Sequence, residues 1–180
     1  MCRTYVGAGR KYLKPLEARD PDFEKRIRES FSCQPFMVTI AASLSRIEPG
    51  RVDISVPFAD HITQQHGCIH GGVVGAIADN AAGYAAYSLI NSEDSVLTVE
   101  YKLTLLATAK GERVEARAEV MRPGRTLTVV RSDVSAYDDG MEMLCATAVV
   151  TLIRMAGRSD QPGDDISGGD IDNRMKDRRL

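Results

Sequence analysis

Residues 70–90 read HGGVVGAIADNAAGYAAYSLI, a stretch with the length and alanine content of a helix. When it is projected at about 100° per residue, seven of its residues lie broadly along one side. These residues are Val73, Val74, Ile77, Ala81, Tyr84, Ala85 and Ser88. The pattern predicts one long helix that buries this side against the rest of the domain.

One carboxylate, Asp79, lies on a different face of this predicted helix. Its neighbours three and four residues away are all small, namely Gly75, Ala76, Ala82 and Gly83. No lysine or arginine stands at helical spacing to pair with it. Small neighbours allow a ligand or another backbone to approach closely. A solvated aspartate on an exposed strip and a functional carboxylate facing a ligand both remain open on this pattern.

The residues before the helix, Gln64 to Gly72, read QQHGCIHGG. Two glycines at a helix start leave unpaired N–H groups open to close approach, and the helix dipole there favours developing negative charge. The oxyanion formed from a thioester carbonyl is such a charge. Tight packing at the helix entry would explain Gly71 and Gly72 equally well.

The rest of the chain predicts strands around this helix. A short helix over 22–31 comes first, and Asp139-Gly140 gives a strong hairpin signal. Two strands are expected before the long helix and four after it, over 42–47, 52–56, 95–106, 113–121, 125–137 and 143–153. One long helix among antiparallel strands predicts an α+β fold in which the sheet wraps the helix.

Composition predicts a single domain with weakly patterned ends. We expect a weakly ordered N-terminal segment over 1–20, the domain over 21–156 and a disordered charged tail over 157–180, which carries many charges and few apolar residues. A basic cluster at the terminus that binds an acidic partner is the alternative for the tail. The formal net charge of −2 argues against nucleic-acid binding, and no apolar run reaches the length of a membrane helix.

Histidines and cysteines offer two rival sites. His61, His66 and His70 invite a zinc interpretation, but they lack the helical or CxxC spacing that fixes a closed site. Cys68 lies near a helix N-terminus, where a thiol can become a nucleophile, although a small loop residue is the simpler explanation. Without a CxxC pair or a secretion signal the four cysteines are interpreted as reduced thiols, which favours a cytoplasmic location.

The run from His70 to Gly83 resembles the PaaI-like branch of the hotdog-fold acyl-CoA thioesterases, which show HGG and an acidic residue nine positions after the histidine. Gln64, six positions before His70, and Gly67 also match. Later segments that match are 98–102, 109–112 and 124–127, and the resemblance covers roughly 36–153. Thr108 departs from the family, many members of which have proline there. The resemblance implies a hotdog fold, an antiparallel sheet of five to six strands wrapped around one long central helix.

The resemblance also implies roles for particular residues. Asp79 would be the nucleophile or general base, the Gly71 N–H would polarise the thioester carbonyl, and Gln64 would orient the carbonyl or the attacking water. Thr98 is a further candidate for positioning water. Substrate contacts are expected from His70, Gly72, Gly83, Arg122, Gly124 and Arg125.

The expected substrate is an acyl-CoA, hydrolysed without a metal or other cofactor by a homodimer or homotetramer whose sites are shared between subunits. No nucleic-acid or membrane partner is expected. Two alternatives remain: a hotdog-fold hydratase or dehydratase, and a non-catalytic acyl-CoA-binding module that would not need Asp79.

Overall fold

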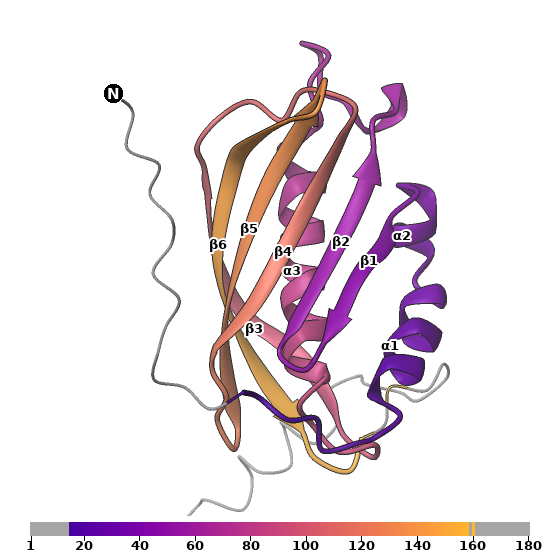
Figure 1. The fold of residues 1–180 in the computed structure, drawn as a ribbon, viewed down its shortest axis with the longest axis vertical. Helices are drawn as coiled ribbons and strands as arrows, with labels where there is room; N and C mark the ends of the chain where they lie inside the picture. Colours follow the sequence, from indigo (N-terminus) through magenta and orange to yellow (C-terminus); the bar gives the residue numbers. More distant parts are fainter. Residues whose placement is uncertain (1–14, 159, 161–180) are drawn as a thin grey trace, which may run out of the picture.

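The computed structural model describes residues 15–158 and residue 160, so the expectations for 1–14, 159 and 161–180 lie outside the described residues. A six-stranded antiparallel sheet curls around one long helix (Figure 1). The helices are α1 (Phe23–Ser32), α2 (Pro35–Thr39) and α3 (Gly71–Tyr87), with a 3-10 turn at Asp60–Ile62. The strands are β1 (Ser43–Glu48), β2 (Arg51–Pro57), β3 (Ser95–Leu105), β4 (Arg113–Arg122), β5 (Leu127–Asp138) and β6 (Met141–Met155). The predicted α+β architecture is confirmed.

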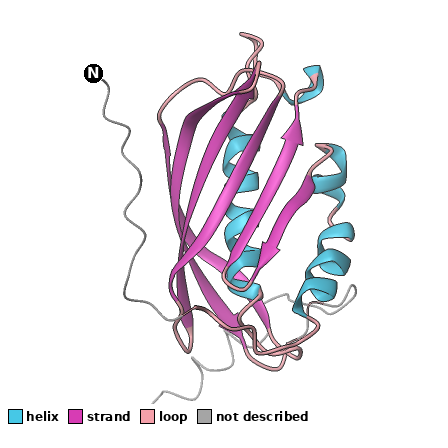
Figure 2. Cartoon of the chain, in the orientation of Figure 1, coloured by secondary structure: helices cyan, strands magenta, loops and turns pink. Residues whose placement is uncertain are grey.

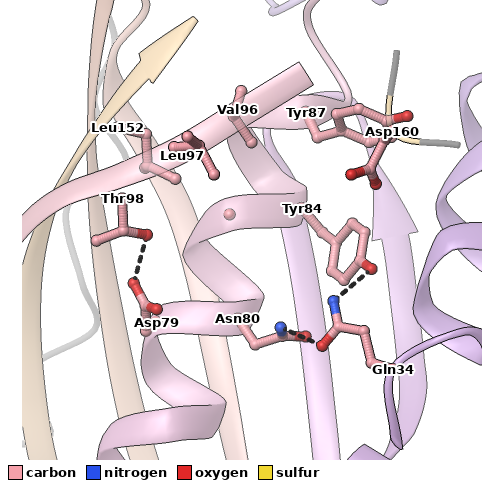
Figure 3. Close-up of a pocket in the computed structure, with 11 residues that line it drawn as sticks. Gln34, Asp79, Asn80, Tyr84, Tyr87, Val96, Leu97, Thr98, Leu152 and Asp160 are labelled. Atoms are coloured by element: carbon pink, nitrogen blue, oxygen red, sulfur yellow. Dashed lines mark hydrogen bonds between the residues drawn. The ribbon is translucent and has the colours of Figure 1, made fainter. Parts of the chain in front are cut away.

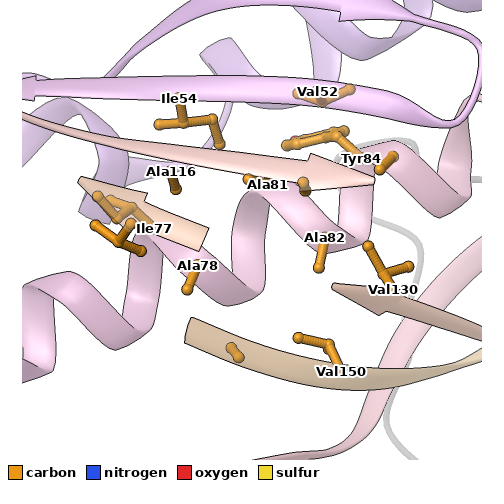
Figure 4. Packing of buried hydrophobic residues seen from close by; sticks show 14 of the residues in the cluster. Val52, Ile54, Ile77, Ala78, Ala81, Ala82, Tyr84, Ala116, Val130 and Val150 are labelled. Atoms are coloured by element: carbon orange, nitrogen blue, oxygen red, sulfur yellow. The ribbon is translucent and has the colours of Figure 1, made fainter. Parts of the chain in front are cut away.

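The strand order β1-β2-β4-β5-β6-β3 places the strand after α3 at one edge of the sheet. Alternation along the strands turns every second side chain toward α3. Val52 faces Ala118 across β2 and β4, and Val130 faces Val150 across β5 and β6. These side chains pack on Ile77, Ala78 and Ala81 of the helix (Figure 4). The small residues of α3 let the curled sheet close around it, with helices α1 and α2 standing outside β1 (Figure 2).

Most predicted boundaries differ from the structure by one to three residues, and two of these differences have local reasons. The helix predicted to reach residue 90 ends at Tyr87, because the buried Ser88 hydroxyl donates to Ala85 O and accepts from Gly50 N, both at 2.7 Å. The strand predicted from residue 125 begins at Leu127. The preceding turn needs Gly124, since a Cβ there would lie 2.0 Å from Leu127 O.

The edge strand β3 pairs with β6 only. A register shift between Thr98 and Glu100 interrupts this pairing. Thr98 lies opposite the buried Leu152, so its side chain faces α3. Val99, Tyr101 and Leu105 remain 57%, 47% and 58% exposed. Tyr101 and Leu105 also lie opposite buried residues of β6 and face α3 near Gly75 and Gly71, so the helix-facing side of this edge strand is partly apolar and open.

Candidate active site

Asp79 lies halfway along α3 and points toward β3 (Figure 3). The Thr98 hydroxyl donates a hydrogen bond of 2.8 Å to Asp79 Oδ1. Within residues 15–158 and 160, no lysine, arginine or histidine forms an ion pair with Asp79. The second carboxylate oxygen has no hydrogen-bond partner in the same part of the chain. One oxygen is therefore held by Thr98, and the other is available to a ligand or water.

Partial burial gives this carboxyl an unusual proton affinity. Burial raises the pKa of Asp79 above its usual value, because the charged form loses hydration. The Thr98 hydrogen bond acts in the opposite direction and lowers the pKa by less. A carboxylate with a raised pKa is a stronger base than a fully hydrated one, provided that it is ionised.

A cavity of about 180 Å³ opens beside Asp79 between α3 and β3. Besides Asp79 and Thr98 its lining includes Gly83, whose missing side chain leaves room on the helix surface. The other lining residues are Gln34, Asn80, Tyr84, Tyr87, Val96, Leu97, Leu152 and Asp160. The structure thus brings together three of the predicted site residues, Asp79, Thr98 and Gly83.

A second group of predicted residues meets at the N-terminus of α3. His70 is the N-cap, and its Nδ1 accepts a hydrogen bond of 2.9 Å from Gly72 N. A Cβ on Gly72 would lie 2.9 Å from that same Nδ1, so this position requires a glycine. The Gly71 N–H has no hydrogen-bond partner in the described part of the chain. His70 and Gly72 thereby fix a helix end at which one amide is free to bind an anion.

Gln64 lies in the loop before this helix end. Its Oε1 accepts a hydrogen bond of 2.8 Å from His66 N, and its backbone N donates to Cys68 O at 2.8 Å. No partner of the Gln64 Nε2 group occurs within the described residues. The hydrogen bond to Oε1 therefore holds the Gln64 side chain in place, and its Nε2 hydrogens are available to donate to another group.

The two groups of residues are separated along the helix. Asp79 follows Gly71 by eight positions, which corresponds to about 12 Å of helix at 1.5 Å per residue. Neither Gly71 nor Gln64 lines the cavity beside Asp79. A single thioester carbonyl cannot touch the Gly71 amide and the Asp79 carboxylate of one chain at the same time.

Arg122, Gly124 and Arg125 lie at the β4–β5 hairpin, away from the Asp79 cavity. In Figure 1 this hairpin is at the end of the sheet opposite the loop that precedes α3. Both arginines are exposed. The hairpin is thus accessible to a large ligand, but it does not contribute to the cavity.

The rival sites are not assembled in the described residues. His61 Nε2 lies 3.1 Å from Thr39 O, and the His66 and His70 rings contact other groups. No three His, Cys, Asp or Glu side chains of residues 15–158 and 160 are placed to share a metal ion. Cys68 is buried, with its thiol 3.8 Å from His66 O. In this part of the chain no helix is both long and apolar enough to cross a bilayer.

Sequence reasoning missed the residues that line the cavity opposite Thr98. Gln34 comes from the turn before α2, which was not predicted, and its Oε1 accepts a hydrogen bond of 2.8 Å from Asn80. Asn80 directly follows Asp79 but points away from it toward Gln34 (Figure 3). Helical spacing alone could have marked Asn80 and Gly83 as neighbours of the same face, but nothing in the sequence links residue 34 to this helix.

Comparison with known proteins identifies the family. Residues 66–143 match the family model of the thioesterase superfamily. A crystal structure of a thioesterase family protein from Silicibacter pomeroyi is 45% identical, with a TM-score of 0.73, and the match covers 74% of this chain and 98% of that one. The chain belongs to the thioesterase superfamily.

Other members are more distant. A 1,4-dihydroxy-2-naphthoyl-CoA hydrolase of Listeria monocytogenes is 24% identical over 116 residues, which are 64% of this chain and 93% of the hydrolase. The structure of the E. coli PaaI protein is 14% identical, with a TM-score of 0.68, and the match covers 77% of this chain and 96% of that one. The two proteins therefore share the fold. The hotdog fold expected from the sequence is confirmed, and the protein is a thioester hydrolase.

Proposed function

We propose that the protein hydrolyses acyl-CoA thioesters to a free acid and coenzyme A, with Asp79 as the catalytic carboxylate. The observation that carries this proposal is an unpaired, partly buried carboxylate, held by Thr98 at the wall of a cavity. The name of the Listeria monocytogenes relative, a CoA hydrolase, supports the choice of coenzyme A as the thiol.

Two routes use the same groups. As a general base, Asp79 takes a proton from water while the water oxygen attacks the thioester carbonyl, and the tetrahedral intermediate expels coenzyme A as a thiolate. As a nucleophile, an Asp79 oxygen attacks the carbonyl and expels the thiolate, and water then hydrolyses the mixed anhydride. Both routes need the ionised carboxylate, and neither needs a metal or cofactor.

The Gly71 N–H is the proposed oxyanion donor, and the distance along α3 implies that it comes from a second subunit. The free edge of β3 supports association there, because an unpaired strand edge offers a ladder of backbone groups and the exposed Tyr101 and Leu105 beside it are apolar surface for a partner to cover. A partner related by a two-fold axis at that edge would offer its Gly71 amide and Gln64 Nε2 to this chain's Asp79 cavity. Each subunit would complete the other's site, in a homodimer or a dimer of dimers.

Remaining residues take supporting roles in this proposal. Thr98 positions the Asp79 carboxylate and His70 and Gly72 shape the donor end of the helix, while Gly83 gives the acyl group room. Arg122 and Arg125, presented by the turn at Gly124, would contact coenzyme A phosphates. An Arg125→Ala variant should raise KM for acyl-CoA and do so far less for a short thioester that lacks the nucleotide.

Subunit mixing tests the shared site. If Asp79 and Gln64 meet across an interface, mixing Asp79→Asn and Gln64→Ala subunits creates dimers in which one site carries both lesions and the other is intact. Random exchange of equal amounts should restore about one quarter of wild-type activity, since half the dimers are mixed and half their sites are intact. No recovery, with exchange confirmed by mass spectrometry, would contradict sharing, as would a monomer by light scattering.

A further inference from the structure

The end of the cavity away from Thr98 is a hydrogen-bonded wall built from three parts of the chain. Asn80 Nδ2 donates to Gln34 Oε1 at 2.8 Å, and Gln34 Nε2 donates to Tyr84 Oη at 2.8 Å. Tyr84 Oη and Ser30 Oγ are 2.9 Å apart, and Ser30 Oγ donates in turn to Asp160. Part of this wall is visible in Figure 3, where Gln34 links Asn80 to Tyr84.

The bonds of this wall run in one direction. Because the Ser30 hydroxyl donates to Asp160, the Tyr84 hydroxyl must donate to Ser30. Burial raises the pKa of Tyr84, so the phenol keeps this proton at neutral pH. The Asn80 bond likewise fixes the Gln34 amide with its nitrogen toward Tyr84.

This arrangement leaves the wall richer in acceptors than in donors. Tyr84 Oη and the Asp160 carboxylate keep unused lone pairs. Asn80 Oδ1 also has no hydrogen-bond partner within the described residues, but it is fully buried and is not counted as an acceptor for a ligand. The unused donors beside them are the second hydrogens of Gln34 Nε2 and Asn80 Nδ2, one from each amide group. A ligand group that donates a hydrogen bond, and can also accept one, would match this wall.

Charge and size restrict the ligand further. The cavity lining includes the carboxylates of Asp79 and Asp160, whereas none of the lining residues is a lysine or arginine. An acyl group with its own carboxylate would add a third negative charge. A cavity of 150 Å³ is known to hold a benzene ring, so about 180 Å³ suits one ring or a short chain. The rise from Asp79 to Tyr84 is about 7.5 Å along α3, so a group that contacts Tyr84 stands at the end of the acyl chain away from the thioester.

We infer that the preferred substrates are thioesters of compact acyl groups that carry a hydroxyl at the far end and no second carboxylate, selected by Tyr84, Gln34 and Asp160. This inference rests on the proposed function, because it takes the cavity beside Asp79 as the acyl site. The substrate hydroxyl donates to the acceptors of the wall and accepts from the free Gln34 N–H. An alkyl end leaves those groups without a partner, and a carboxylate end repels Asp160.

Matched substrates test the inference. Hexanoyl-, 6-hydroxyhexanoyl- and adipoyl-CoA have six-carbon chains that end in methyl, hydroxymethyl and carboxylate groups, and butanoyl-, 4-hydroxybutanoyl- and succinyl-CoA repeat the series with four carbons. In at least one series, the wild-type protein should hydrolyse the hydroxyacyl member with a kcat/KM about tenfold or more above that of both other members. A difference of this size is the effect of one hydrogen bond to a buried partner. Release of coenzyme A, followed with a thiol reagent, gives the rates.

Two variants assign the preference to the wall. Tyr84→Phe keeps the ring that packs edge-on against Phe31 and Tyr87 but removes the hydroxyl, so the ratio of hydroxyacyl to alkyl kcat/KM should fall to within about threefold of one. Asp160→Asn should raise the relative rate of the dicarboxylic member. Tyr137→Phe is the matched control, since Tyr137 contacts Arg117 outside the cavity, and it should leave both ratios unchanged.

The outcomes separate this inference from the proposed function. If the wild-type protein hydrolyses the series but prefers the alkyl or dicarboxylic member, or shows no preference, the inference is wrong and the proposed function stands. A preference that survives Tyr84→Phe in folded protein also overturns it. If neither series is hydrolysed but another acyl-CoA is, the inference is wrong and the proposed function stands; if no acyl-CoA of any kind is hydrolysed, both fail.

Discussion

Thr98 Oγ1 donates a hydrogen bond of 2.8 Å to Asp79 Oδ1, joining the edge strand β3 to the middle of α3. The bond fixes the carboxylate in one rotamer and occupies one of its oxygens. It also opposes the effect of burial on the proton affinity of Asp79. The proposed catalytic group is therefore positioned and tuned by one hydroxyl.

Thr98→Val removes this hydroxyl while keeping the shape of the side chain. Loss of a bond to the ionised carboxylate raises the pKa of Asp79 further, so the acidic limb of the kcat/KM profile should shift to higher pH. We also expect kcat to fall by roughly threefold to tenfold at neutral pH. Thr98→Ser should restore the wild-type profile. Thr104→Val, on the same strand, should not move the limb, and an unmoved limb in Thr98→Val would refute the tuning role.

Asp79→Asn should stabilise the protein at neutral pH. Burial raises the pKa of Asp79 in the folded state, so the ionised form opposes folding once the pH exceeds the unfolded pKa of about 3.9. The gain in melting temperature over wild type should be absent near about pH 4 and grow to its full size as the pH rises through the folded-state pKa. Calorimetry across this range measures it. A gain in melting temperature that is constant with pH, or a loss at neutral pH, would contradict a raised folded-state pKa of Asp79.

Two glycines of α3 should respond differently to replacement by alanine. At Gly72 a Cβ would lie 2.9 Å from His70 Nδ1, so the cap must shift, and Gly72→Ala should lower the melting temperature. At Gly83 the nearest atom would be Leu152 Cδ2 at 3.8 Å, an ordinary contact. Gly83→Ala should therefore be neutral or stabilise by about 0.5–1 kcal/mol, the usual gain within a helix. Equal effects of the two changes on thermal unfolding would show that the cap geometry is wrong.

The expected charged tail can be tested by two truncations. Gly157 N donates to Asp94 Oδ1 at 2.9 Å, and Asp160 accepts from Ser30. Removal of residues 157–180 should lower the melting temperature by a few degrees because it deletes both bonds. We expect removal of 161–180 alone to change it little, since that composition offers few apolar residues to bury. A large loss from the shorter deletion would show that these residues pack on the domain.

Much of the fold was predictable because its signals are local. The alanine-rich helix, the alternating strands and the Asp139-Gly140 hairpin all depend on residues close in sequence, and each occurs within three residues of its expected position. Asp79 was marked by its small neighbours and Thr98 by the family resemblance, and the structure joins them by a hydrogen bond. Positions 70–72 were understood as a helix start, and the contact between His70 and Gly72 explains why a glycine is needed there.

The polar wall was not predictable from the sequence, because it depends on contacts between distant residues. Gln34 and Asn80 are 46 positions apart, and Ser30 and Tyr84 are 54 apart. Neither Gln34 nor Ser30 belongs to a motif, and α2 is a five-residue helix beginning at a proline, too short for a periodic signal. The separation between Gly71 and the Asp79 cavity likewise emerged only with the helix in place.

Turnover by Asp79→Asn tests the central claim most directly. The amide is nearly isosteric and can still accept the Thr98 hydrogen bond, so the fold should be retained while the base or nucleophile is lost. We predict that kcat for a hydrolysed acyl-CoA falls by ~10²–10⁴ or more, with unchanged circular dichroism and oligomeric state. A folded Asn variant that keeps more than a tenth of wild-type kcat would contradict the assignment of Asp79 as the catalytic carboxylate.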